Sequence, residues 1–198
     1  MGLMLSEEEI KDSETIFTVP NLISVIRLIF IPVFLWLLIF ENKIYLAAWL
    51  LAFLGVTDFL DGWLARRLGQ VSKLGKILDP AADRLLLLSV VVGGIVSGVI
   101  PTWLIVIVGI REVLILLGAL WLLIKKAPHI DVTKAGKLGT LLLMLSFPLF
   151  LVANSHAFWS QEAYFAARLI SIPGIIISWY AAFGYIKILN SLTKRKLL

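Results

Sequence analysis

The residues best suited to chemistry lie in one stretch, "VTDFLDGWLARRLGQVSKLGKILDPAADR", which contains two pairs of aspartates. Asp58 and Asp61 are three positions apart, and Asp79 and Asp83 are four apart, so each pair shares one face if the stretch is helical. Carboxylates about 4 Å apart repel by about 1 kcal/mol per pair in water and about 4 kcal/mol at an effective dielectric of about 20. Four together therefore need protons or cations. Oxygen ligands without His or Cys suit Mg²⁺ or Mn²⁺ better than zinc, so the pattern favours a site for such an ion.

Small residues and an arginine accompany the acids. Gly62 directly follows the first pair, Gly75 precedes the second, and Ala65 lies between them. Small side chains leave room for a ligand to approach the backbone, and the Arg66 fork can pair with phosphate. The alternative, that acids at helix ends are solvated or paired with neighbouring arginines, stays open for any single aspartate. Four acids at this spacing favour a phosphate-handling site in which metal ions neutralise phosphate and stabilise a leaving oxygen.

The rest of the chain is typical of a membrane protein. Of its 198 residues 60% are hydrophobic, and the mean hydropathy is +0.98. A helix that crosses about 30 Å of hydrocarbon needs about 20 mostly apolar residues. Six runs fit, and we predict six transmembrane helices over residues 22–40, 44–59, 85–100, 102–124, 138–153 and 170–188, the last together with its flanks. The second and third runs are short unless helix continues through the aspartates, so we expect these acids on helix at the membrane surface.

The predicted organisation is a single all-α membrane domain, residues 20–198, preceded by an acidic segment, residues 1–19. That segment lacks a cleavable signal pattern and is expected to be a solvated tail, with an interfacial helix as the alternative for its end. Zero cysteines exclude disulfides and thiolate metal sites.

Lys and Arg gather on one side of the predicted spans. They occur in residues 66–76, 125–137 and 194–196, whereas the opposite side carries Lys43, with Arg168 near the start of the last span. This asymmetry predicts a cell-membrane protein whose aspartates and both termini are cytoplasmic. The net charge of +5 would attract anionic headgroups. Nucleic acid is not an expected partner, because the charges flank spans instead of forming a separate basic domain.

The pattern D-x-x-D-G-x-x-A-R, eight residues, G-x-x-x-D-x-x-x-D, which runs from Asp58 to Asp83, resembles the signature of the CDP-alcohol phosphotransferases, with every position filled. The segments "TVPNLISVIRLIFIP", "IRE" and "KAGKLGT" are similar to the phosphatidylglycerophosphate synthase and cardiolipin synthase branch of that family. The resemblance therefore covers most of the chain.

The resemblance implies six transmembrane helices around a polar cavity open to the cytoplasm, usually in a homodimer. It assigns the four aspartates to one or two divalent cations against the pyrophosphate of a CDP-linked lipid. Asp83 would also be the general base that takes the proton of the acceptor alcohol as CMP leaves. The residues implied to shape the CDP-lipid site are Gly62, Ala65, Arg66 and Gly75.

The expected donor is CDP-diacylglycerol, and the candidate acceptor-binding cations are Arg27, Arg111, Lys134 and Lys137. Each has an ordinary alternative. Arg27 could extend to the interface, and the lysines could be positive-inside charges. Arg111 could be a structural ion pair with Glu112, although adjacent helix positions do not face each other.

The identity of the acceptor is predicted from two basic residues that this chain lacks. Enzymes of this family that act on glycerol 3-phosphate usually carry a second Arg after the Arg-Glu pair and a Gly-Lys-x-Lys-Thr segment. This chain has "LGALW" at the first place and Gly139 in place of the second lysine. We therefore predict phosphatidylglycerol as the acceptor, which makes the chain a cardiolipin synthase. Glycerol 3-phosphate, as in a phosphatidylglycerophosphate synthase, is the alternative, followed by inositol-type acceptors.

A small ion transporter is the remote alternative from another class, since intramembrane carboxylates often mark ion paths. Transport would favour acids near the bilayer midplane and repeated, broken helices. The four aspartates cluster at one predicted interface instead, and no repeat is evident.

Overall fold

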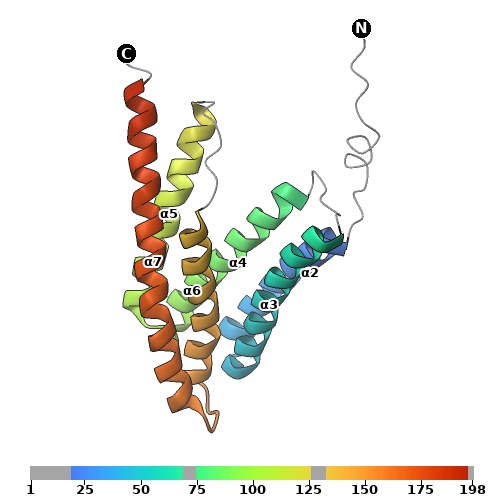
Figure 1. Ribbon diagram of the computed structural model, residues 1–198. Coiled ribbons are helices and arrows are strands. Elements are labelled where there is room, and N and C mark those ends of the chain that lie inside the picture. Colours follow the sequence, from blue (N-terminus) through green and yellow to red (C-terminus); the bar gives the residue numbers. More distant parts are fainter. Residues whose placement is uncertain (1–18, 69–74, 126–132, 196–198) are drawn as a thin grey trace. The chain divides into compact units, whose positions relative to one another are not determined.

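The computed structural model describes residues 19–68, 75–125 and 133–195, with backbone alone at 19–20, 58–68, 76–77, 79–80, 123 and 185–195. Within these ranges all regular structure is helical (Figure 1). The chain divides into two compact units, residues 1–93 and 94–198, which are described in turn. The predicted acidic segment lies outside the described residues except for its last residue.

The first unit begins with α2, Val19–Leu35, which runs directly into a π-helical turn, η1, Trp36–Phe40. The wider turn is visible in its backbone bonding, since the Glu41 amide donates to the Trp36 carbonyl at 3.1 Å, five residues back. The chain then reverses at Asn42, whose φ of 52° is better tolerated by Asn than by most residues. The Lys43 ammonium lies 3.0 Å from the Glu41 carboxylate, and its hydrogen bond holds the pKa of Glu41 below the usual value.

Helix α3, Ile44–Leu68, returns along α2 (Figure 1). Its buried face is marked by Ala47, Leu51 and Leu54. At about 100° per residue, positions 58, 61 and 65 continue that face. The helix passes through the first aspartate pair without a break, which confirms the prediction that these acids lie on helix.

Helix α4, Gly75–Ser97, begins before the second aspartate pair and carries it in its first turns, as predicted. Its buried positions include Ala82, Leu86 and Gly93. A Cβ at Gly93 would lie 2.9 Å from Leu38 Cδ2, so α4 packs closely against the side chains of η1 at this position. Position 79 falls on the same face as Ala82 and Leu86, and position 83 at its edge.

The second unit contains α5, Thr102–Ile124, α6, Lys134–Ala153, and α7, Ser160–Arg195. Helices α6 and α7 lie side by side (Figure 1). Their contact depends on small residues: a Cβ at Gly139 would lie 2.6 Å from the Ser178 amide nitrogen. A Cβ at Gly174 would lie 3.1 Å from Leu142 Cβ. Such close backbone approach is typical of packing between membrane helices.

Four helices among the described residues are long and apolar enough to cross a membrane: Asn21–Phe40, Thr102–Leu122, Lys134–Ala153 and Ser160–Gly184. The apolar part of α3, Ile44–Thr57, is shorter. Four of the six predicted spans thus have support from length and composition, and the spans on α3 and α4 stay predictions.

The last helix begins at Ser160, ten residues before the apolar run that starts at residue 170, so the flank expected with that run is helical. Glu162 and Arg168 interrupt the apolar pattern of the sequence, but both side chains are exposed while Ala163 and Ala167 are buried. The segment before residue 170 is therefore a helix with one small-residue face, and it extends the predicted apolar run. Arg168 lies more than two turns inside α7, not near its start.

Candidate functional site

The predicted donor-site residues lie on two continuous helices of the first unit. Asp58, Asp61, Gly62, Ala65 and Arg66 belong to α3, and Gly75, Asp79 and Asp83 belong to α4. Of these, only Gly75 and Asp83 have described side-chain surroundings. The convergence of the four carboxylates therefore lies outside the described side chains and stays a prediction. Among the side chains that are described, no three of His, Asp and Glu form a metal-sized group.

Asp83 forms an ion pair with Arg27 across the first unit. Arg27 Nη1 donates to Asp83 Oδ1 at 2.6 Å, and the Arg27 side chain is completely buried whereas that of Asp83 is 46% exposed. The alternative that Arg27 extends to the membrane interface is therefore wrong. Breaking a buried pair by removing one partner is costly, so this bond fixes α2 against α4 and orients the carboxylate. An oriented, half-exposed carboxylate can accept a proton from a hydroxyl.

The pairing of Arg27 with Asp83 was not predicted from the sequence. A signal was present, since Arg27 is the sole charged residue of α2, "VPNLISVIRLIFIPVFL". A charge that cannot extend to the membrane surface needs a buried partner. The identity of that partner, 56 positions along the chain, depends on how α2 packs against α4.

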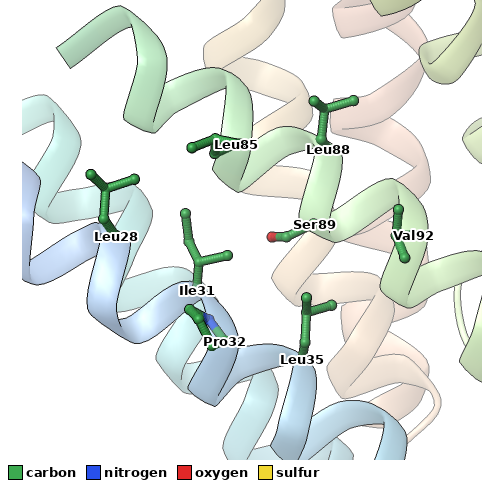
Figure 2. A pocket seen from close by; sticks show the side chains of 8 residues that line it. All are labelled: Leu28, Ile31, Pro32, Leu35, Leu85, Leu88, Ser89 and Val92. Atoms are coloured by element: carbon green, nitrogen blue, oxygen red, sulfur yellow. The ribbon is translucent and has the colours of Figure 1, made fainter. Parts of the chain in front are cut away.

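An apolar hollow of about 350 Å³ lies beside this ion pair. Its walls run from Leu28 to Leu35 on α2 and from Leu85 to Val92 on α4 (Figure 2). Its one hydroxyl, on Ser89, donates to the carbonyl of Leu86 at 2.6 Å, so this donor is already satisfied without a ligand. The hollow begins one residue after Arg27 and two after Asp83, and its lining suits hydrocarbon.

A second polar cluster lies in the other unit, between α5 and α6. Arg111 and Glu112 are each 6% exposed, and Arg111 Nη1 donates to Glu112 Oε1. The ion pair that the sequence left open is therefore present, because both side chains are long enough to bend toward each other although adjacent helix positions do not face each other. Arg111 Nη2 also donates to Thr140 Oγ1 at 3.2 Å. Thr140 was not among the predicted site residues.

The first turns of α6 carry the two predicted lysines. Lys134 and Lys137 are both exposed. Thr133 caps the helix, its hydroxyl accepting from the Gly136 amide at 3.1 Å. A helix start favours anions, so cations placed here strengthen an anion-binding end. Of the predicted acceptor-site residues in this unit, Arg111 contacts the first turns of α6 through Thr140, and the role of the two lysines stays a prediction.

The comparisons with known proteins decide the family. The family model described as CDP-alcohol phosphatidyltransferase matches residues 17–185, which is most of the chain. The chain belongs to the CDP-alcohol phosphatidyltransferase family. The resemblance stated from the aspartate pattern is confirmed, and this phosphatidyltransferase family member is an enzyme that transfers substituted phosphate groups. The transporter alternative is not retained.

Relatives of this family member carry two kinds of name. A cardiolipin synthase (CMP-forming) of Streptomyces coelicolor is 35% identical over 179 residues, covering 88% of this chain and 83% of the relative. A putative cardiolipin synthase of Mycobacterium tuberculosis is 37% identical over 155 residues, covering 78% and 74%. A CDP-diacylglycerol–glycerol-3-phosphate 3-phosphatidyltransferase of Aquifex aeolicus is 51% identical over 67 residues, covering 33% and 36%.

Proposed function

We propose that this phosphatidyltransferase moves a phosphatidyl group from CDP-diacylglycerol to the headgroup hydroxyl of phosphatidylglycerol, forming cardiolipin and releasing CMP. The acceptor oxygen bonds to the β-phosphorus, the pyrophosphate bond to CMP breaks, and the acceptor proton passes to Asp83. The long matches to relatives named cardiolipin synthase support this assignment.

In the proposed arrangement, α3 and α4 complete a six-helix domain over residues 20–198 in the cell membrane, with the polar cavity, both termini and the acidic segment 1–19 cytoplasmic. The distribution of Lys and Arg in the sequence supports that orientation. A homodimer is proposed from the family resemblance.

Asp83 is the proposed general base. Its carboxylate is half exposed and is held by a buried arginine, so it keeps a fixed direction while remaining within reach of an acceptor hydroxyl. Arg27 stays a proposed acceptor-side cation, and its bond to Asp83 supports a place next to the reacting hydroxyl. The neighbouring hollow has the right lining for an acyl chain of either lipid.

The donor set fits a hard divalent cation. Asp58, Asp61, Asp79 and Asp83 offer oxygen ligands alone, at spacings of three and four on unbroken helices. Bound Mg²⁺ or Mn²⁺ would neutralise the pyrophosphate and stabilise the leaving oxygen of CMP. Gly62, Ala65, Arg66 and Gly75 are proposed to shape the space for the CDP-lipid.

Removal of divalent metal is expected to abolish turnover. Purified protein treated with excess chelator should release no CMP above background, and added Mg²⁺ or Mn²⁺ should restore the rate. The reason is that four carboxylates close to a pyrophosphate repel both one another and the substrate without counter-charge. Full turnover in excess chelator would contradict the metal assignment. Recovery of the original rate when Mg²⁺ is added back to the chelated protein is the control for integrity, since it shows that the protein stayed folded without metal.

The observation that carries the choice of acceptor is the contact of Gly139 with α7. Position 139 is where glycerol-3-phosphate enzymes carry a second lysine. In this chain it faces the backbone of Ser178, and a Cβ there would lie only 2.6 Å from the Ser178 amide nitrogen. The second Arg that those enzymes usually carry after the Arg-Glu pair is also absent from this chain, which has "LGALW" there. A site with fewer net cations suits phosphatidylglycerol, which has one phosphodiester charge, better than the doubly charged glycerol 3-phosphate.

The acceptor is tested by offering purified protein CDP-diacylglycerol with phosphatidylglycerol, glycerol 3-phosphate or inositol phosphate, each alone. We expect CMP release and cardiolipin with phosphatidylglycerol, and rates at least tenfold lower with the other two. Product from glycerol 3-phosphate alone would overturn the proposal in favour of a phosphatidylglycerophosphate synthase, the alternative that the Aquifex aeolicus match supports.

A further inference from the structure

We propose that Thr140 is a positioning residue of the acceptor site. Its hydroxyl holds the Arg111 guanidinium so that the buried Nε–H meets one phosphate oxygen of the acceptor lipid. This inference rests on the proposed function and adds to it a residue that neither the motif nor the comparisons assign.

One N–H donor of the Arg111 guanidinium lacks a hydrogen-bond acceptor among the described residues. A guanidinium has five N–H donors, of which Nη1 reaches Glu112 and Nη2 reaches Thr140. Nε has no acceptor in the part of the chain that the structure describes, although the residue is only 6% exposed. A buried donor of a charged group without an acceptor is rare and costly. A substrate oxygen would satisfy it.

The Thr140 hydroxyl holds the Arg111 guanidinium as an acceptor, because its own proton is already used in another hydrogen bond. Its hydroxyl proton is directed to the Gly136 carbonyl at 3.0 Å, so a lone pair of the oxygen is left for Arg111 Nη2. The Gly136 amide is in turn bonded to the Thr133 hydroxyl at 3.1 Å. This chain of hydrogen bonds fixes the guanidinium to the first two turns of α6. Lys137, three positions before Thr140, lies on the neighbouring part of the same helix face.

The pairing also indicates the class of ligand. Because Glu112 cancels the charge of Arg111, the pair offers a directed N–H more than a net positive charge. One directed donor, with a nearby exposed lysine, suits a single oxygen of a phosphodiester monoanion. Phosphatidylglycerol has such a group next to the hydroxyl that reacts.

The test compares Thr140→Val, which keeps the shape and removes the hydroxyl, with Thr140→Ser, which keeps the hydroxyl. Ser146→Ala is the matched control on the same helix, since the buried Ser146 hydroxyl donates to its own helix at Leu143, at 2.8 Å. For each variant, kcat and the KM values of both lipids are measured as mole fractions in mixed micelles, with the melting temperature in the same detergent.

We expect Thr140→Val to raise the KM for phosphatidylglycerol about tenfold, the effect of one hydrogen bond to a charged group. The KM for CDP-diacylglycerol and the melting temperature should stay unchanged, Thr140→Ser should restore the wild-type KM, and Ser146→Ala should match wild type. If Thr140→Val does not fold, Thr140→Ala is measured in its place, with the same expectation.

A purely structural role for Thr140 would instead lower the melting temperature and change both KM values together. That result, or a Thr140→Ser variant as impaired as Thr140→Val, would overturn the proposal. The proposed function is tested separately, with the wild-type protein. It fails if the wild type forms product from glycerol 3-phosphate and not from phosphatidylglycerol. In that case the same variants measured with glycerol 3-phosphate still decide whether Thr140 positions Arg111.

Discussion

Asp83→Asn is expected to lower CMP release by about a hundred- to ten-thousand-fold, the usual contribution of a general acid or base. The amide oxygen can still accept the bond that Arg27 Nη1 gives to Oδ1, so the contact between α2 and α4 should persist. What the variant loses is the ability to take the proton of the acceptor hydroxyl. Binding of CDP-diacylglycerol, measured in the absence of acceptor, should therefore remain largely intact.

Glu41→Gln is the matched control for Asp83→Asn. Glu41 also lies in the first unit and pairs with a basic side chain, at 3.0 Å from Lys43, but it is exposed and follows η1. We expect wild-type turnover from this variant. Substantial residual turnover by Asp83→Asn would remove Asp83 from the role of general base. Loss of donor binding together with turnover would assign Asp83 to holding the donor instead.

The helices around the aspartates could be predicted because the relevant information is local. Spacings of three and four, and apolar runs too short to span a membrane without them, both require helix through the acids. Helices α3 and α4 do continue through positions 58–61 and 79–83. The family could be predicted for the same reason, since the signature is a contiguous pattern.

The partners of the buried cations could not be predicted, because they depend on tertiary packing. Arg27 pairs with a residue 56 positions away, and Arg111 reaches Thr140, 29 positions away. The rule that adjacent helix residues do not face each other describes Cβ directions, and it fails for long side chains that share a buried space. The length of the flank that precedes residue 170 in α7 could not be predicted, because its buried face consists of small residues such as Ala163 and Ala167, which give a weak hydropathy signal.

Gly139 shows how a structure can change the meaning of a sequence difference. From the sequence, this glycine is a missing phosphate-binding lysine. In the second unit it lies where α6 packs closely against the α7 backbone, with a Cβ position 2.6 Å from the Ser178 amide nitrogen and 2.8 Å from the Ser178 Cα. Backbone atoms of a helix cannot move aside as a side-chain tip can. The chain therefore has a different helix contact at this place, and not simply one cation fewer.

Gly139→Lys is accordingly expected to damage the protein without changing its acceptor. Overpacking of this kind costs about 1–3 kcal/mol, and here the whole α6–α7 contact must open, so the melting temperature should fall by several degrees. Turnover with phosphatidylglycerol should drop, and turnover with glycerol 3-phosphate should not rise. Gly184→Lys is the matched control, because a Cβ at Gly184 on α7 meets nothing within 4 Å and should leave both properties near wild type. A Gly139→Lys variant that melts like wild type and gains glycerol 3-phosphate transfer would mean that charge alone, and not the helix contact, sets the acceptor.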